Sequence, residues 1–196
     1  IYLLPVESQK LIADLNKTAL EKVEAKWETL VMHNKVGGFR IVVFKDKKIV
    51  FSRLAQQLVG NNVADVLVGN LEQEVSNTVE YIKRMGFTGE VDSKLTIISE
   101  AEILQKIDSK AFNFGHVDLF TPYQLAERLS ISDCVADSDK FADILVAAHF
   151  ASSGKHVLKF TTSHTKKMEV FSLAKKATYG LGLLGTLGLA GMAGFE

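Results

Sequence analysis

The C-terminal segment, residues 177–195 (ATYGLGLLGTLGLAGMAGF), contains no charged side chain. As an α-helix it would rise about 28 Å, close to the roughly 30 Å hydrocarbon core of a bilayer. Small residues recur at every third position of the segment, at Gly182, Gly185, Gly188, Gly191 and Gly194. This spacing lets a second helix approach closely. The segment therefore predicts a transmembrane helix that packs on a partner's helix or on its own copy. A buried glycine-rich hairpin and a disordered tail are the alternatives.

Basic side chains lie directly before this segment. Lys175 and Lys176 precede it, and Lys166 and Lys167 lie slightly further upstream. Lysine and arginine are enriched on the cytoplasmic side of membrane helices. We therefore expect a cytoplasmic globular domain over residues 1–170, followed by a C-terminal membrane helix over residues 171–196.

Composition limits what the globular part does. The chain has 23 basic and 23 acidic residues, whereas nucleic-acid-binding proteins normally carry a basic excess, so we expect no nucleic-acid partner. A single cysteine, Cys134, excludes an internal disulfide framework and fits a reducing compartment. About 175 residues before the apolar segment are enough for one domain with a sizeable core. The chain opens with Ile1 rather than Met, which fits a fragment of a longer protein. The apolar run of residues 1–6 is too short for a signal peptide and contains Pro5.

The order of hydrophobic patterns predicts an α/β domain with a mixed sheet. Three segments rich in β-branched and aromatic residues, 27–33, 39–44 and 49–54, are separated by short turns and predict an antiparallel meander. Residues 94–99 are almost continuously apolar, which is typical of a strand in the middle of a sheet. Further strands are expected at residues 1–5 and, at an edge, within residues 112–119.

Apolar residues at helical spacing predict the helices. We expect them over residues 7–26, 63–85, 100–107, 121–129 and 138–152, with a tail helix from about His164. The sequence 121–124 (TPYQ) has the signature of a helix start. Thr121 is the predicted N-cap, Pro122 the first helical residue and Gln124 the reciprocal capping partner.

Motifs that carry chemistry are missing from the sequence. It contains no G-x-x-x-x-G-K-[ST] phosphate loop, no G-x-G-x-x-G fingerprint and no G-x-S-x-G elbow. No two of its five histidines are spaced i and i+4, and one cysteine cannot build a thiolate zinc site. Cys134 with a distant histidine is a conceivable nucleophile, but a free thiol in a polar loop is the favoured interpretation. We therefore predict no catalytic, cofactor-binding or metal-binding residue.

Three weaker features leave alternatives open. Four acidic residues could place oxygen ligands around a cation, but a solvated loop before a helix N-terminus is favoured; they are Asp133, Asp137, Asp139 and Asp143. Two glycine-containing turns could approach phosphates, but ordinary turn chemistry is favoured; they are Gly37-Gly38 and Gly60-Asn61-Asn62. Two arginines on predicted strands, Arg40 and Arg53, are expected to pair with acids on neighbouring strands rather than to bind substrate.

Residues 37–86 (GGFRIVVFKDKKIVFSRLAQQLVGNNVADVLVGNLEQEVSNTVEYIKRMG) resemble the second half of an actin-like, ribonuclease-H-type domain. The segment is most similar to the PilM-like and GspL-like cytoplasmic domains of type IV pilus and type II secretion systems. The resemblance lies in the glycine turn between two strands, a third strand ending in a Ser-Arg pair and a glycine-asparagine loop before a long helix. The matching residues are Gly37, Gly38, Ser52, Arg53, Gly60, Asn61 and Asn62, with Glu72, Glu74 and Tyr81 on the helix. The opening Leu3–Ser8 also looks like that family's entry into this half, and the diffuse resemblance extends over roughly residues 1–170.

This chain departs from actin-like ATPases at the first hairpin. An acidic residue followed by glycine serves the metal and phosphates of the nucleotide there, whereas residues 33–37 read HNKVG without a carboxylate. The N-terminal nucleotide-binding half of the family is also missing from this chain. We therefore expect no ATP hydrolysis, no cofactor and no metal.

The resemblance implies a non-catalytic scaffold in a bacterial inner membrane. Its expected partners are other pilus or secretion platform proteins, a cytoplasmic motor ATPase and possible further copies of itself. The long helix over residues 63–85 and exposed sheet edges are the expected contact surfaces. The alternatives are a nucleotide-binding actin-like protein with a degenerate phosphate site, and a small protein whose tail inserts into a target bilayer.

Overall fold

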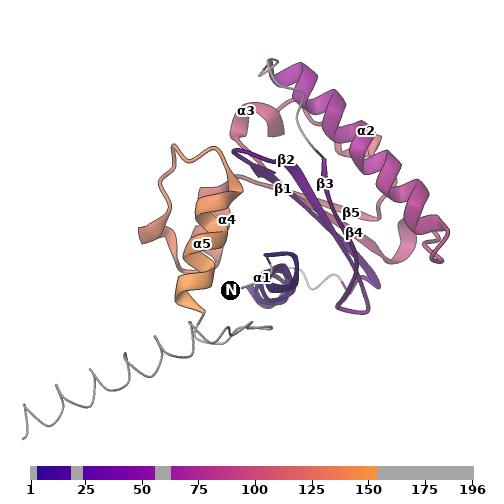
Figure 1. Cartoon of the computed structure of the whole chain (residues 1–196), viewed down its shortest axis with the longest axis horizontal. Helices are drawn as coiled ribbons and strands as arrows, with labels where there is room; N and C mark the ends of the chain where they lie inside the picture. Colours follow the sequence, from indigo (N-terminus) through magenta and orange to yellow (C-terminus); the bar gives the residue numbers. More distant parts are fainter. Residues whose placement is uncertain (1–3, 19–23, 56–62, 154–196) are drawn as a thin grey trace, which may run out of the picture. The chain divides into compact units, whose positions relative to one another are not determined.

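The fold is described here from a computed structural model, which describes residues 4–18, 24–55 and 63–153. Five strands form one sheet in the order β3-β2-β1-β4-β5 (Figure 1). The strands are β1 (Trp27–Asn34), β2 (Gly38–Lys45), β3 (Lys48–Ala55), β4 (Ser93–Ile98) and β5 (His116–Phe120). The first three strands form an antiparallel meander, and β4 and β5 run parallel to β1. The predicted mixed sheet is therefore confirmed, and β4 lies inside it as expected.

The hairpin turns follow from local chemistry. Asp46 and Lys47 connect β2 to β3 with φ values of 50° and 64°, the left-handed conformation that two-residue hairpin loops require. The ladder between β2 and β3 shifts its register between Val43 and Phe44. A bulge of this kind bends an edge strand, which opposes its pairing with a further strand.

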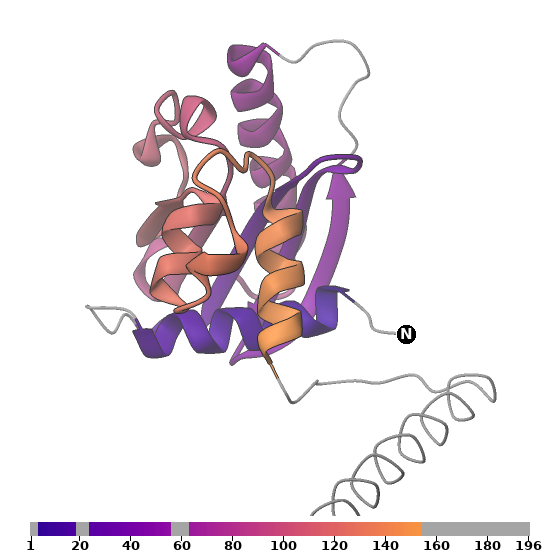
Figure 2. The same cartoon turned by 90° about the vertical axis from the view of Figure 1, so that its left-hand side faces the viewer.

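In the described part of the chain, five helices cover the two faces of the sheet (Figure 1). They are α1 (Leu4–Thr18), α2 (Ala64–Lys83), α3 (Ala101–Leu104), α4 (Pro122–Arg128) and α5 (Ala142–Ser152). The long helix α2 covers one face, whereas α1, α4 and α5 cover the other (Figures 1 and 2). Three short 3-10 turns complete the described part, at Glu90–Asp92, Ser109–Ala111 and Ser132–Cys134.

Strand alternation divides the core into two layers. Val31 and the other odd residues of β1 face α2, whose buried side includes Leu71 and Ile82. Leu30 and Met32 point to the opposite layer, beneath α1, α4 and α5. Successive side chains of a strand point to opposite faces, so a strand covered on both faces is apolar throughout. All eight residues of β1 are buried, as this position requires.

Local signals set most element boundaries, with four corrections. The helix predicted over residues 100–107 is too long, because α3 ends at Leu104. The predicted strand at residues 1–5 is wrong for its described part, because α1 already begins at Leu4. The helix predicted to Lys26 is too long, since residues 24–26 are not helical. The helix predicted from Ser138 begins at Ala142, because residues 138–141 cross the end of the sheet in a non-helical path.

The predicted start of α4 is confirmed in detail. The Thr121 hydroxyl accepts a hydrogen bond from the Gln124 amide N–H at 3.2 Å. The Gln124 side chain accepts one from the Thr121 amide N–H at 2.9 Å, and Pro122 opens the helix. The two bonds satisfy backbone donors that the first helical turn would otherwise leave unpaired.

Within the described ranges, no helix combines the length and the apolar character that crossing a membrane requires. The predicted membrane helix over residues 171–196, with Lys175, Lys176 and its glycines, lies outside the described residues. The same holds for the predicted tail helix and for the Gly60-Asn61-Asn62 turn.

A polar cluster fastens α1 to α5, which lie against each other (Figure 2). The Asp14 carboxylate accepts hydrogen bonds from Lys10 at 2.7 Å, Lys17 at 2.9 Å and His149 Nε2 at 3.1 Å. Burial alone would raise the pKa of Asp14, but these three hydrogen bonds outweigh it and hold that pKa well below its usual range. Burial lowers the pKa of His149, and this outweighs the opposing hydrogen bond to Asp14. His149 is therefore neutral near pH 7 and donates its Nε2 proton to Asp14.

Because of this cluster, we expect the free energy of unfolding to decrease on mild acidification. The pKa of His149 lies below its ordinary value of 6.5 in the folded chain, so the unfolded chain takes up the proton first as the pH decreases. The stability that neutral His149 contributes is fully present above about pH 6.5. It is lost as the pH falls from there toward the pKa of His149 in the folded chain. Asp14 acts at lower pH, because its contribution is complete above its ordinary pKa of 3.8 and declines only below it. Urea unfolding of the full chain between pH 7.5 and pH 5 should show the loss, and His149→Gln should flatten it. An equal slope in His149→Gln would contradict the assignment.

Candidate functional site

Polar side chains gather where β1 and β4 end. The two strands are parallel neighbours, so their carboxyl ends meet at the same edge of the sheet. His33 and Asn34 close β1, and Ser99 follows β4; all three are buried. The Ser99 hydroxyl lies 3.2 Å from His33 Nδ1 and joins the two strand ends. This edge is where open α/β sheets place their ligands, which makes it the first candidate for a functional site.

The turn between β1 and β2 borders this edge, and the local structure explains why glycine occupies two of its positions. Gly38 has a φ of 72°, in the left-handed region that glycine adopts without strain. A Cβ on Gly37 would lie 3.0 Å from Leu54 Cδ1 of β3, closer than side chains normally approach. The predicted turn chemistry at Gly37-Gly38 therefore accounts for both residues.

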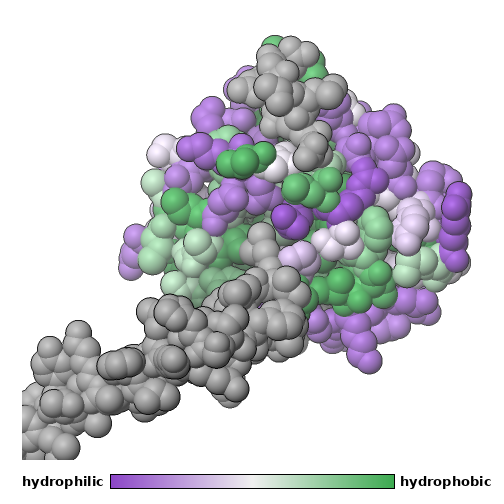
Figure 3. All heavy atoms as spheres, viewed as in Figure 1, coloured by the Kyte–Doolittle hydropathy of each residue, from purple (hydrophilic) through white to green (hydrophobic). Residues whose placement is uncertain are grey.

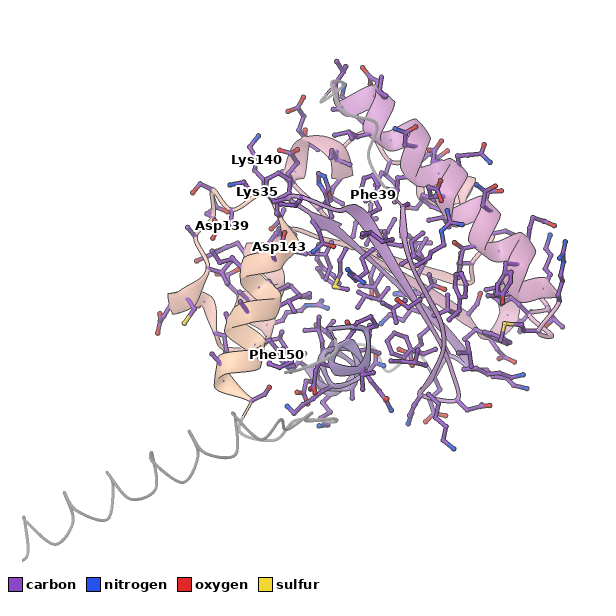
Figure 4. The ribbon with its side chains drawn as sticks, viewed as in Figure 1. Lys35, Phe39, Asp139, Lys140, Asp143 and Phe150 are labelled. Atoms are coloured by element: carbon purple, nitrogen blue, oxygen red, sulfur yellow. The ribbon has the colours of Figure 1, made fainter. Side chains whose placement is uncertain are left out.

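Asp143, from the first turn of α5, caps this hairpin turn. Its Oδ2 accepts the backbone N–H of Lys35 at 2.8 Å, and its Oδ1 accepts the Asn34 side-chain amide at 3.0 Å. Figure 4 shows Asp143 and Lys35 together at this end of the sheet, with Lys140 beside them. A carboxylate of the chain itself thus takes the turn's donors, which are the groups that a bound anion would use.

The neighbours of Asp143 fasten the same segment to the sheet edge. Lys140 forms an ion pair with Glu100, directly after β4, at 2.8 Å. The hydrogen bond with Glu100 raises the pKa of Lys140, and the Glu100 charge adds to the shift. The Phe141 ring packs edge-on against the His33 ring at 5.0 Å. Residues 140–143, which we name the closing segment, therefore cover the ends of both β1 and β4.

The closing segment opposes the binding of an anion at this edge. A phosphate at the hairpin would have to displace the Asp143 carboxylate or lie beside a second negative charge, which like-charge repulsion opposes. Asp143 also lies at the start of α5, where a carboxylate interacts favourably with the helix dipole. The donors of the hairpin turn that Asp143 binds are therefore already occupied by a carboxylate of the same chain.

The acidic residues near α5 do not form a cation site. Asp139 accepts the Ala136 N–H at 2.8 Å, and Asp143 caps the hairpin, so the two carboxylates serve the backbone. Among the described residues, no three histidine, cysteine, aspartate or glutamate side chains lie close enough to hold a metal ion. Cys134 is an exposed free thiol in the 3-10 turn Ser132–Cys134.

The residues that carry the family resemblance fasten α2 to the edge strand β3. Arg53 forms an ion pair with Glu74, and the Tyr81 ring packs on Phe51 at 4.6 Å. The expected pairing of Arg53 with an acid on a neighbouring strand is therefore wrong, because its partner lies on a helix that crosses the sheet. Arg40 forms no ion pair within the described ranges, so the expectation fails there as well.

No protein-family model matches this chain, and no curated protein sequence matches it. The resemblance to PilM-like and GspL-like domains therefore stays a prediction that depends on the residues quoted above.

The favoured prediction, that Asp143 lies at a helix N-terminus, is confirmed, but its contact with the hairpin was not predicted, and no function was predicted for His33 or Ser99. Asp143 is 109 positions from Asn34, and Ser99 is 66 positions from His33. Predicting β1 and β4 as parallel neighbours would have brought His33 and Ser99 together. No local signal connects Asp143 to the hairpin, because that contact depends on where α5 packs.

Replacing Asp143 tests the capping role. Asp143→Ala removes the acceptor for the Lys35 N–H and the Asn34 amide, and should lower the free energy of unfolding by about 1–2 kcal/mol. It also frees these donors, so added sulfate should raise the melting temperature of Asp143→Ala more than that of the wild type. Thermal and urea unfolding of the full chain measure both effects, with the exposed Asp137→Ala as a near-neutral control. Equal stabilities of Asp143→Ala and Asp137→Ala would contradict the capping role.

Proposed function

We propose that this chain is a non-catalytic, membrane-anchored scaffold of a type IV pilus or type II secretion inner-membrane platform. An actin-like, ribonuclease-H-type domain would lie on the cytoplasmic side, and residues 171–196 would anchor it. Its partners would be sibling platform subunits and a cytoplasmic motor ATPase.

The order of elements supports the domain assignment. The resemblance implies two strands joined by a glycine turn, a third strand after a polar turn, and then a long helix. The structure has β1, β2, β3 and α2 in this order, followed by β4 and β5 parallel to β1. The pairs Arg53–Glu74 and Phe51–Tyr81 give the resembling residues a shared role in fastening α2 to β3.

The capped hairpin is the observation that carries the non-catalytic part of the proposal. In an actin-like ATPase this turn serves the phosphates and the metal of the nucleotide. Here the backbone N–H of Lys35 and the Asn34 amide already bind Asp143. A domain that satisfies its own phosphate-binding donors is suited to protein–protein contact rather than to nucleotide turnover.

The exposed surface of α2 fits a polar partner surface. Figure 3 shows mostly hydrophilic residues over this helix. Two apolar side chains lie exposed toward its C-terminal end, Tyr81 at 48% and Met85 at 37%. Amphipathic aromatic residues such as tyrosine are enriched at protein interfaces, so this end of α2 is the favoured contact region.

Membrane association tests the anchor directly. The full chain should be recovered in the membrane fraction after cell breakage and resist extraction by high salt, because an uncharged helix partitions into hydrocarbon. A variant ending at Lys176 should move to the aqueous fraction. Replacing Gly182 and Gly188 by leucine should keep the chain in the membrane but weaken its copurification with partners, because close helix approach is lost. A full chain found wholly in the aqueous fraction would contradict the anchor.

Nucleotide binding tests the non-catalytic part. The wild-type chain should show no saturable binding of a fluorescent ATP analogue, because Asp143 occupies the donors of the hairpin. Equilibrium fluorescence titration of the full chain in detergent measures this. Micromolar affinity that Gly37→Ala abolishes would favour the nucleotide-binding alternative.

A further inference from the structure

A pocket of about 950 Å³ lies at the opposite edge of the sheet, where β1 begins and the β2–β3 turn ends. Its wall is formed by α1, the start of β1 and the turn at Asp46 and Lys47. The pocket is separate from the closing segment, which covers the carboxyl ends of β1 and β4. Its volume is at the upper end of the range that small-molecule sites occupy.

A buried carboxylate faces this pocket. Glu28 of β1 is among the pocket's lining residues and is only 4% exposed. Its Oε2 accepts a hydrogen bond from the Asn16 side-chain amide of α1 at 2.7 Å. Among the described residues this is the sole hydrogen bond to the carboxylate, so Oε1 keeps its acceptor capacity.

The basic side chain on the neighbouring strand forms its ion pair with another carboxylate. Lys94 is opposite Glu28 in the parallel ladder, but its Nζ pairs with Asp118 Oδ2 at 2.9 Å. Lys94 also donates to Asn16 Oδ1 at 3.5 Å, so the Asn16 amide lies between the ammonium and the carboxylate. No ion pair joins Glu28 to a basic side chain within the described ranges. Buried charges are normally paired, because removing an ion from water is costly.

The other described lining residues indicate which kind of ligand the pocket fits. Ile12, Ala13 and Phe44 supply apolar wall to the pocket, which fits a methylene chain. The exposed rim carries both acidic and basic side chains, including Asp46 and Lys26, so its net charge selects no ligand. Among the described lining residues, Glu28 is the one acidic or basic side chain that is buried. A cation beside it would supply the ion pair that a buried carboxylate normally has.

We propose that this pocket binds an alkylammonium group, with the ammonium on Glu28 Oε1 and the methylene chain along Ile12 and Phe44. An ammonium has three donors and would form a charge-assisted hydrogen bond with the open carboxylate oxygen. The group has two possible sources, a free aliphatic amine or the lysine side chain of a partner protein. Both present the same chemistry to Glu28.

Calorimetric titration of the full chain in detergent separates these sources. Cadaverine represents the free amine, Nα-acetyl-lysine methylamide represents a partner's lysine, and pentane-1,5-diol is the uncharged control. Saturable binding of either amine, without binding of the diol, is the expected result. Binding of cadaverine alone identifies a free amine, and binding of the lysine derivative alone identifies a partner's side chain.

Two variants test the assigned position. Glu28→Gln keeps the shape but removes the charge, and should weaken amine binding at least tenfold, whereas Glu102→Gln on the exposed side of α3 should leave it unchanged. If Glu28→Gln does not fold, Ala13→Trp narrows the pocket from the exposed side of α1 and should abolish binding. Failure of the wild type to bind either amine, equal binding by Glu28→Gln or by Ala13→Trp, or equal binding of the diol would overturn the proposal.

Discussion

The complete burial of β1 is the constraint on which the rest of the structure depends. This strand pairs with β2 on one side and β4 on the other, and helices cover both of its faces. Burial on all sides fixes its register. A shift by one residue would turn Leu30 and Met32 toward the layer of α2, and Val31 and His33 toward the layer of α1, α4 and α5. The antiparallel hairpin then extends to β3, and the parallel strands β4 and β5 follow on the other side.

The two edges that β1 connects have different electrostatic characters. At its carboxyl end, Asp143 binds the hairpin and Lys140 forms an ion pair with Glu100. At its amino end, Glu28 is buried, and among the described residues it accepts one hydrogen bond, from Asn16, and forms no ion pair. Asp143 and Lys140 at the first edge have partners within the chain, whereas Glu28 at the second forms no ion pair with a described basic residue. This contrast is why we assign ligand chemistry to the amino end of β1, although ligands of open α/β sheets usually bind at the carboxyl ends.

Elements with strong local signals were predicted well. The meander, the long helix and the capping box of α4 depend on β-branched runs, on helical periodicity and on Thr121 and Gln124, which are close in sequence. The predicted strand at residues 1–5 is wrong at Leu4 and Pro5, which belong to α1. An apolar run of five residues is too short for its periodicity to distinguish a strand from a helix. The start of α5 was placed four residues early because the path of residues 138–141 is set by contacts with the sheet edge.

The sequence by itself determined the α/β class, the antiparallel meander, the apolar C-terminal segment and the neutral overall charge, because each is a property of composition or of local periodicity. Only the tertiary structure decided that Asp143 caps a hairpin 109 positions away, that Arg53 pairs with Glu74 on α2, and that Glu28 is buried beside a pocket. These contacts join residues far apart in the chain. They depend on which strands are neighbours and on which face each helix covers, and no local pattern encodes either choice.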